Sequence, residues 1–224
     1  MPEMASPTAH APTAPSSVGF NLAALSVLVV LAALGLAYWV DGTSREARAP
    51  GPVLDDDRLV TQAIAGRELA IPQSWFRNGH EARTGFASQI DLQVMLSPAD
   101  VEPFPVQVTL LPPSRARTSA SLLDRVYLHQ FEEGTLSGVV GLVGKPVAGP
   151  GYRGETVWYD PLSPNPFVAK CIAPVDEEAT RQCVRTVYLP SGIAAVYTFS
   201  QPALAAWREF DAEMGEWLGR IGAL

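Results

Sequence analysis

Residues Phe167-Val-Ala-Lys-Cys-Ile-Ala173 and Cys183-Val-Arg-Thr-Val-Tyr-Leu189 form two short runs rich in β-branched, aromatic and other apolar side chains. The segment between them contains Pro174 and three acidic residues at 176–178, which is the composition of a polar turn. Two β-prone runs joined by such a turn predict a β-hairpin. The hairpin decides the fold class, because it commits this part of the chain to antiparallel strands.

The chain has two cysteines, and one lies in each of these runs, Cys171 and Cys183. If they face each other, the same register pairs Ala169 with Arg185. Directly opposed Cβ atoms lie about 4.5–5.5 Å apart, so modest further approach allows a disulfide. We therefore predict a Cys171–Cys183 disulfide, with two reduced, buried cysteines as the alternative. A metal site or a redox pair is not favoured, because no histidine is near and the spacing is not Cys-x-x-Cys.

Further strands are predicted on both sides of the hairpin. In Ile90-Asp-Leu-Gln-Val-Met-Leu96 the apolar side chains alternate with polar ones, which is typical of a half-buried strand. Residues 58–66 are predicted to form a short strand or a turn. The other predicted strands cover residues 68–73, 103–111, 155–160 and 192–199.

Two helices are predicted from apolar residues at three- and four-residue spacing. One covers residues 121–133 and is followed by Gly134, a residue suited to the position after a helix. The other is the C-terminal helix, which begins after Ser200. Its apolar stripe is predicted to pack on the sheet, with docking of a partner helix as the alternative. The stripe consists of Trp207, Phe210, Met214, Trp217 and Ile221.

The order of these elements is strands, helix, strands, helix, without regular β–α alternation. This order favours an α+β domain over residues 58–224, with an antiparallel β-sheet packed against helices on one face. The number of residues is sufficient for one domain with its own core.

The N-terminal part of the chain contains an uncharged apolar run from Gly19 to Val40. About 20 such residues span a bilayer as a helix, so we predict a transmembrane helix at 19–40 with the lipid bilayer as its partner. Residues 1–18 are rich in Pro and Ala and are predicted to be disordered, and residues 41–57 to form a juxtamembrane linker. A signal peptide cleaved near Ala47-Arg48-Ala49 and a buried helix are the alternatives.

Two observations disagree on the orientation of this predicted helix. Arg45, Arg48 and Arg58 follow the span and no basic residue precedes it, which favours a cytoplasmic C-terminal domain. A structural disulfide persists in oxidising compartments, which favours a periplasmic domain. We predict a single-pass protein of the bacterial inner membrane, with the C-terminal domain in the periplasm.

Composition and motifs argue against several functions. The formal net charge is −7 and no block of Lys or Arg occurs, so nucleic acid is not an expected partner. The sequence 149–154 matches Gly-x-Gly-x-x-Gly but is predicted to precede a strand, whereas a dinucleotide site needs a helix there. No paired-ligand spacing predicts a metal, and no motif predicts a cofactor or catalytic residues.

We therefore predict a non-catalytic binding or scaffolding domain, whose ligand the sequence does not identify, with a protein of the cell envelope as a candidate partner. A membrane-anchored hydrolase whose carboxylates converge in the fold is one alternative, and a cytoplasm-facing assembly factor is another. If a surface recognises a ligand, the segment richest in aromatic, Gly and Pro residues is the candidate, with a rigid loop as the alternative interpretation. The candidate residues are Tyr152, Arg153, Trp158, Tyr159 and Asp160.

The run from Tyr152 to Cys183, after a short N-terminal anchor, resembles small single-pass membrane proteins of unknown function from alphaproteobacteria. This resemblance implies a location and no activity. A shorter match, at Ile71, Pro72 and Trp75 together with the final Trp-bearing helix, is similar to the PsbP/Mog1-like α/β/α sandwich domains.

Overall fold

The computed structural model describes residues 27, 30–33, 58–149, 154–174 and 179–224. The chain divides into two units, Met1–Ala49 and Pro50–Leu224. In the first unit, Val27 and residues 30–33 are helical. None of the helices in the described ranges combines the length and the apolarity that crossing a bilayer requires. The predicted tail (1–18), the linker (41–57) and most of the predicted span (19–40) lie outside the described residues.

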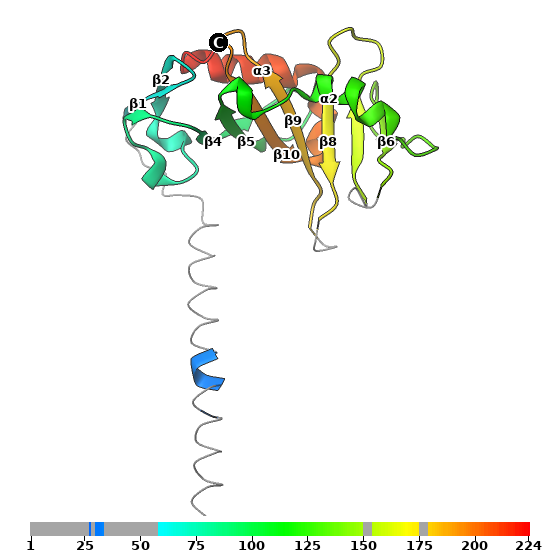
Figure 1. Ribbon diagram of the computed structural model, residues 1–224, viewed down its shortest axis with the longest axis horizontal. Coiled ribbons are helices and arrows are strands. Elements are labelled where there is room, and N and C mark those ends of the chain that lie inside the picture. Colours follow the sequence, from blue (N-terminus) through cyan, green and yellow to red (C-terminus); the bar gives the residue numbers. More distant parts are fainter. Residues whose placement is uncertain (1–26, 28–29, 34–57, 150–153, 175–178) are drawn as a thin grey trace, which may run out of the picture. The chain divides into compact units, whose positions relative to one another are not determined.

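The centre of the second unit is a seven-stranded antiparallel sheet, which confirms the predicted α+β class and the antiparallel strands (Figure 1). In strands β4 and β5, buried residues alternate with half-buried or exposed ones, as their sequence pattern predicts. In spatial order the strands are β4 (Ile90–Leu96), β5 (Phe104–Leu111), β10 (Ala194–Ser200), β9 (Gln182–Tyr188), β8 (Val168–Ile172), β7 (Thr156–Tyr159) and β6 (Val143–Pro146).

A second, three-stranded sheet includes residues 58–66, where the sequence predicts a short strand or a turn, and the predicted strand at 68–73. Strands β1 (Leu59–Ile64) and β2 (Arg67–Pro72) are antiparallel, and β3 (Gly85–Phe86) pairs with β1 in parallel. Ala65 and Gly66 have φ of 50° and 79° and form the two-residue hairpin turn, which favours positive φ at both positions. Short 3₁₀ turns follow at Gln73–Trp75, Gly79–Glu81 and, after β5, Pro113–Arg115.

The C-terminal helix α3 (Trp207–Arg220) follows a 3₁₀ segment, Gln201–Ala206. Phe210, Met214 and Ile221 of its predicted stripe are buried, and Trp207 and Trp217 are partly buried against the same core. The prediction that this stripe packs on the sheet is therefore confirmed.

The second helix, α2 (Ser119–Arg125), corrects the prediction that the helices cover one face of the sheet. Val157 and Val168 pack in a cluster with Leu123 and Tyr127 from α2 and the turn that follows it. Trp158, the strand neighbour of Val157, belongs to the main core together with α3. Because successive strand residues point to opposite faces, α2 and α3 lie on opposite faces of the sheet.

Helix α2 is also shorter than the predicted helix at 121–133. It ends before Val126, whose φ of −127° and ψ of −60° are not helical, and a 3₁₀ turn, Tyr127–His129, follows. Phe131 then forms a β-bridge with Val147, and its ring stacks on Tyr159 at a centroid distance of 5.9 Å. Tertiary packing of Phe131 thus replaces the last turn of the predicted helix.

Candidate functional site

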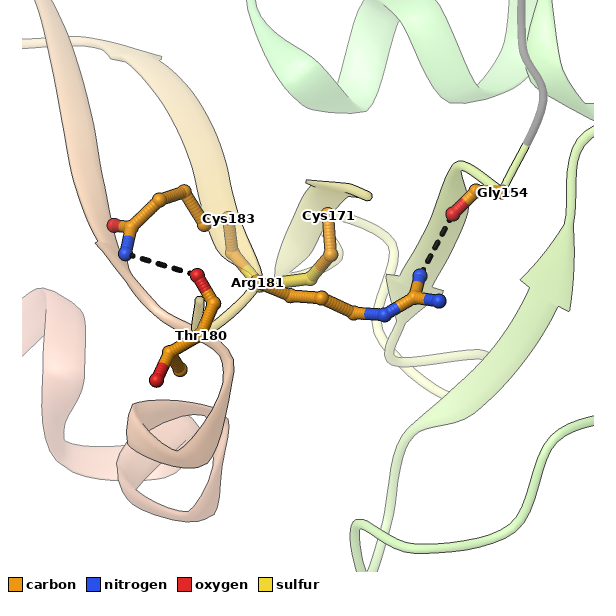
Figure 2. Close-up of a disulfide and its surroundings, with 6 residues drawn as sticks. Gly154, Cys171, Thr180, Arg181 and Cys183 are labelled. Carbon is orange, nitrogen blue, oxygen red and sulfur yellow. Dashed lines mark hydrogen bonds between the residues drawn. A yellow bond between two sulfur atoms is a disulfide. The ribbon is translucent and has the colours of Figure 1, made fainter. Parts of the chain in front are cut away.

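The two cysteines lie directly opposite each other in β8 and β9, as predicted, and form a disulfide. Both are fully buried. Figure 2 shows the disulfide next to the side chain of Arg181, whose Nη1 donates a hydrogen bond of 2.7 Å to the carbonyl of Gly154. The bridge holds β8 and β9 together at the end nearest their turn.

Beyond the disulfide, β8 and β9 separate. Their pairing ends at Lys170 and Val184, so the expected pairing of Ala169 with Arg185 does not form. The amide of Thr186 donates instead to the hydroxyl of buried Ser119 at 2.8 Å. Arg185 Nη1 donates to the carbonyl of Val168 at 3.3 Å. Side chains from α2 and β9 therefore take the place of strand pairing at this end.

The residues before β8 prevent strand pairing from resuming further along β9. Pro164 and Pro166 precede Phe167, the last residue before β8. Proline has no amide hydrogen, so it cannot donate to a neighbouring strand. In the register of the disulfide, Pro166 would lie opposite Tyr188, so no strand pairing with this segment forms at that end of β9.

The separation leaves a recess of about 410 Å³, which we term the β8–β9 notch. Its walls come from α2, the loop before β8, strands β9 and β10, and α3. The residues that define it here are Thr118, Asn165, Arg185, Tyr188, Tyr197 and Asp211.

An ion pair between Arg185 and Asp211 lines the notch. Arg185 Nε donates to Asp211 Oδ1 at 2.9 Å, and Nη2 donates to Oδ2, so the contact is bidentate. The guanidinium also lies 4.4 Å above the centre of the Phe167 ring. The Arg185 side chain is only 6 % exposed, whereas that of Asp211 is 51 % exposed. The pair thus links β9 to α3 through a cation that is almost withdrawn from water.

Replacing Asp211 with alanine is expected to lower the free energy of unfolding by about 2–3 kcal/mol, because it leaves a buried guanidinium without its counter-ion. This loss of stability is smaller than the loss expected for a fully buried ion pair, because the Asp211 side chain is in contact with water. Urea unfolding of the full-length protein measures it. Glu216→Ala, an exposed position of the same helix, removes the same charge and should change stability by less than about 0.5 kcal/mol. Equal effects of the two variants would contradict the structural importance of the pair.

Tyr197 of β10 forms another wall of the notch and is almost completely buried. Burial raises the pKa of its phenol, the Asp211 carboxylate raises that pKa further, and the Arg185 guanidinium opposes the rise. Tyr197 therefore stays neutral in the folded protein at pH values where a tyrosine in the unfolded chain ionises.

This raised pKa predicts a loss of stability at high pH. The stabilising contribution of neutral Tyr197 is fully present below the unfolded pKa of about 10 and is lost as pH rises through the higher folded pKa. The free energy of unfolding of the unmodified protein should therefore fall more steeply above pH 10 than that of Tyr197→Phe. Denaturant unfolding at a series of pH values tests this, and parallel curves for the two proteins would contradict it.

The structure separates the side chains of the described residues of the predicted ligand surface. Trp158 is 3 % exposed and lies in the core, while Tyr159 points to the opposite face and stacks on Phe131. Asp160 Oδ1 accepts a hydrogen bond from the amide of Leu162 at 3.0 Å. Tyr152 and Arg153 lie outside the described residues. The assignment of a ligand surface to this segment stays a prediction.

Arg185 and Asp211 are not among the functional residues predicted from the sequence. The sequence did contain an indication for Arg185. It lies two residues from Cys183 in the predicted strand and therefore on the same, buried face, where a charged side chain requires a partner. Asp211 gave no such signal, since acidic residues on a helix are normally solvated. Within the described ranges, no group of His, Cys, Asp and Glu is placed to hold a metal ion.

Comparisons with known proteins identify a solved structure with a similar fold, but no protein family. No family model matches the chain, and no curated protein matches it. A solved structure, an immunity protein of the Stenotrophomonas maltophilia type IV secretion system, is similar with a TM-score of 0.51. The match covers 76% of this chain and 97% of that protein, at 11% sequence identity. This likeness concerns the fold alone, and the two resemblances noted in the sequence stay predictions.

Proposed function

We propose that this protein is a single-pass membrane protein whose extracytoplasmic domain binds another protein of the cell envelope and does no catalysis. The observation that carries the proposal is the β8–β9 notch, a recess held open by bonds from Arg185, Asp211 and Ser119. A recess that exists before binding costs little reorganisation when a partner enters it.

The bonding within the notch favours binding over catalysis. The Arg185 guanidinium is engaged by Asp211, by the Val168 carbonyl and by the Phe167 ring. Among the described side chains that line the notch, Asp211 supplies the carboxylate, and it is already ion-paired. A hydrolase that uses two carboxylates needs a second one within reach. These groups are arranged to fix a shape rather than to transfer protons.

The proposed location has three supports. The Cys171–Cys183 disulfide is typical of an oxidising compartment. The apolar run at 19–40 is long enough for an anchor. The fold is similar to that of an immunity protein of a type IV secretion system, and from that likeness we infer an envelope location and a binding role for this chain.

The location is tested by fusing alkaline phosphatase after Leu224 and by labelling free thiols in intact cells. We expect an active phosphatase, and thiols that react only after reduction and unfolding. An inactive fusion at normal expression, together with free thiols, would favour the cytoplasm-facing assembly factor and overturn the extracytoplasmic assignment.

Binding through the notch is tested with a photo-crosslinking amino acid at Asn165, which is exposed at its rim. The full-length protein is expressed in its membrane, irradiated, and its cross-linked products are identified by mass spectrometry. The control position is Asp100, an exposed residue that does not line the notch. We expect one protein to be captured reproducibly from Asn165 and not from Asp100. The same products from both positions, or none from Asn165, would contradict the proposal.

A further inference from the structure

We propose that the partner inserts an extended, acidic segment of its chain into the notch and pairs with the open edge of β9 at Thr186 and Tyr188. This inference rests on the proposed function and adds the chemistry of the partner. It is carried by three observations: unused backbone groups on β9, the space beside them, and the charge around that space.

The first observation is the direction of the backbone groups of β9. The Leu189 amide donates to the Ile193 carbonyl at 2.8 Å, so the odd-numbered residues of β9 direct their backbone groups toward β10. The even-numbered residues therefore direct theirs toward β8. Ser119 accepts the amide of Thr186. This leaves the carbonyl of Thr186 and both backbone groups of Tyr188 facing the notch, where no described residue bonds to them.

The residue that would pair with Tyr188 cannot do so. If the register of Cys171 with Cys183 continued, Pro166 would lie opposite Tyr188. Pro166 lines the notch but has no amide to offer. Unpaired groups on a strand edge are a template for an added strand, in which main-chain hydrogen bonds supply affinity. The Tyr188 edge is therefore complementary to an extended peptide.

The second observation is the space next to this edge. Tyr188 lines the notch and also a second recess of about 310 Å³, which is formed by residues 113–117. The Tyr188 hydroxyl shares its single hydrogen between the carbonyls of Pro113 and Ala116, at 3.2 and 2.7 Å, which fixes the side chain that lines both recesses. Alternate side chains of an added strand would point to opposite faces of the sheet, one of which is the face that carries the Tyr188 side chain.

The third observation is the charge around the two recesses. Arg115, Arg117 and Arg185 line them, against one acidic residue, Asp211. Arg115 and Arg117 are exposed, and no described residue forms an ion pair with Arg117. Because Arg185 and Asp211 neutralise each other, the exposed Arg115 and Arg117 make this a positive patch on a chain whose formal net charge is −7. Such a patch attracts an acidic segment and repels a basic one.

The charge is tested by selecting randomised displayed peptides against the full-length protein in lipid nanodiscs. We expect the enriched peptides to be acidic, and Arg117→Glu to weaken their binding by about tenfold or more. Arg67→Glu is the control, since it makes the same charge change at an exposed position of β2. Enrichment of neutral or basic peptides, or equal loss in the two variants, would overturn the inference.

The backbone pairing is tested with the enriched peptides. Peptide binding should slow hydrogen exchange of the Tyr188 amide, measured by NMR, while amides of β4 stay unchanged. N-methylation of alternate peptide amides should abolish binding for one set of positions and leave it intact for the other. Tolerance of both sets would exclude strand addition. If that occurs while Asn165 still cross-links a partner, the inference fails and the proposed function stands.

Discussion

Replacing Phe210 with alanine is expected to lower the free energy of unfolding by about 3–5 kcal/mol, because removing a buried phenyl ring eliminates its packing contacts and leaves a cavity. Phe210 is 0 % exposed on the inner face of α3. Its ring centre lies 4.8 Å from that of Phe199, 5.6 Å from that of Tyr197 and 6.1 Å from that of Phe167. These residues come from β10 and from the entry to β8, so the ring joins α3 to both sides of the notch.

Chemical unfolding followed by tryptophan fluorescence measures this loss. Phe86→Ala is the matched control, because Phe86 is 94 % exposed and should change stability by less than about 0.5 kcal/mol. A loss below about 1 kcal/mol for Phe210→Ala would contradict the central position of this ring.

Removing the disulfide is expected to lower the free energy of unfolding by about 3 kcal/mol, the value expected for a loop closed across a sequence separation of 12. The bridge limits the conformations of the unfolded chain. It also joins β8 and β9 at one of only three residue pairs that connect these strands in the described part of the chain. The effect should therefore exceed that of an equally buried apolar contact.

The measurement compares equilibrium unfolding of the unmodified protein and of Cys171→Ala/Cys183→Ala, each with and without a reductant. The unmodified protein should fall to the stability of the double variant when reduced, and the double variant should not respond. If the reductant leaves the unmodified protein unchanged, the bridge does not stabilise the fold as described.

The sequence predicted the elements that depend on local patterns. The alternation in Ile90–Leu96 gave a strand, and the opposed cysteines gave the register of the hairpin. The apolar stripe of the C-terminal helix was also correctly assigned to the core. These features follow from side-chain periodicity, which the sequence carries directly.

Features that depend on contacts between distant segments could not be predicted. The face on which α2 packs is decided by Val157 and Val168, which are far from it in sequence. The notch depends on Ser119 bonding to Thr186 and on Asp211 bonding to Arg185, across 67 and 26 residues. No local pattern records which serine or which aspartate will meet a given strand.

The early end of the β8–β9 pairing divides the seven-stranded sheet into two parts. Strands β4, β5, β10 and β9 are fully paired with each other, and β6, β7 and β8 form a smaller group. Such a seam defines a cooperative unit that can open below the free energy of global unfolding. Cutting the sulfur bridge should therefore release β6–β8 first, and their amides should exchange with solvent while those of β4 and β5 remain protected.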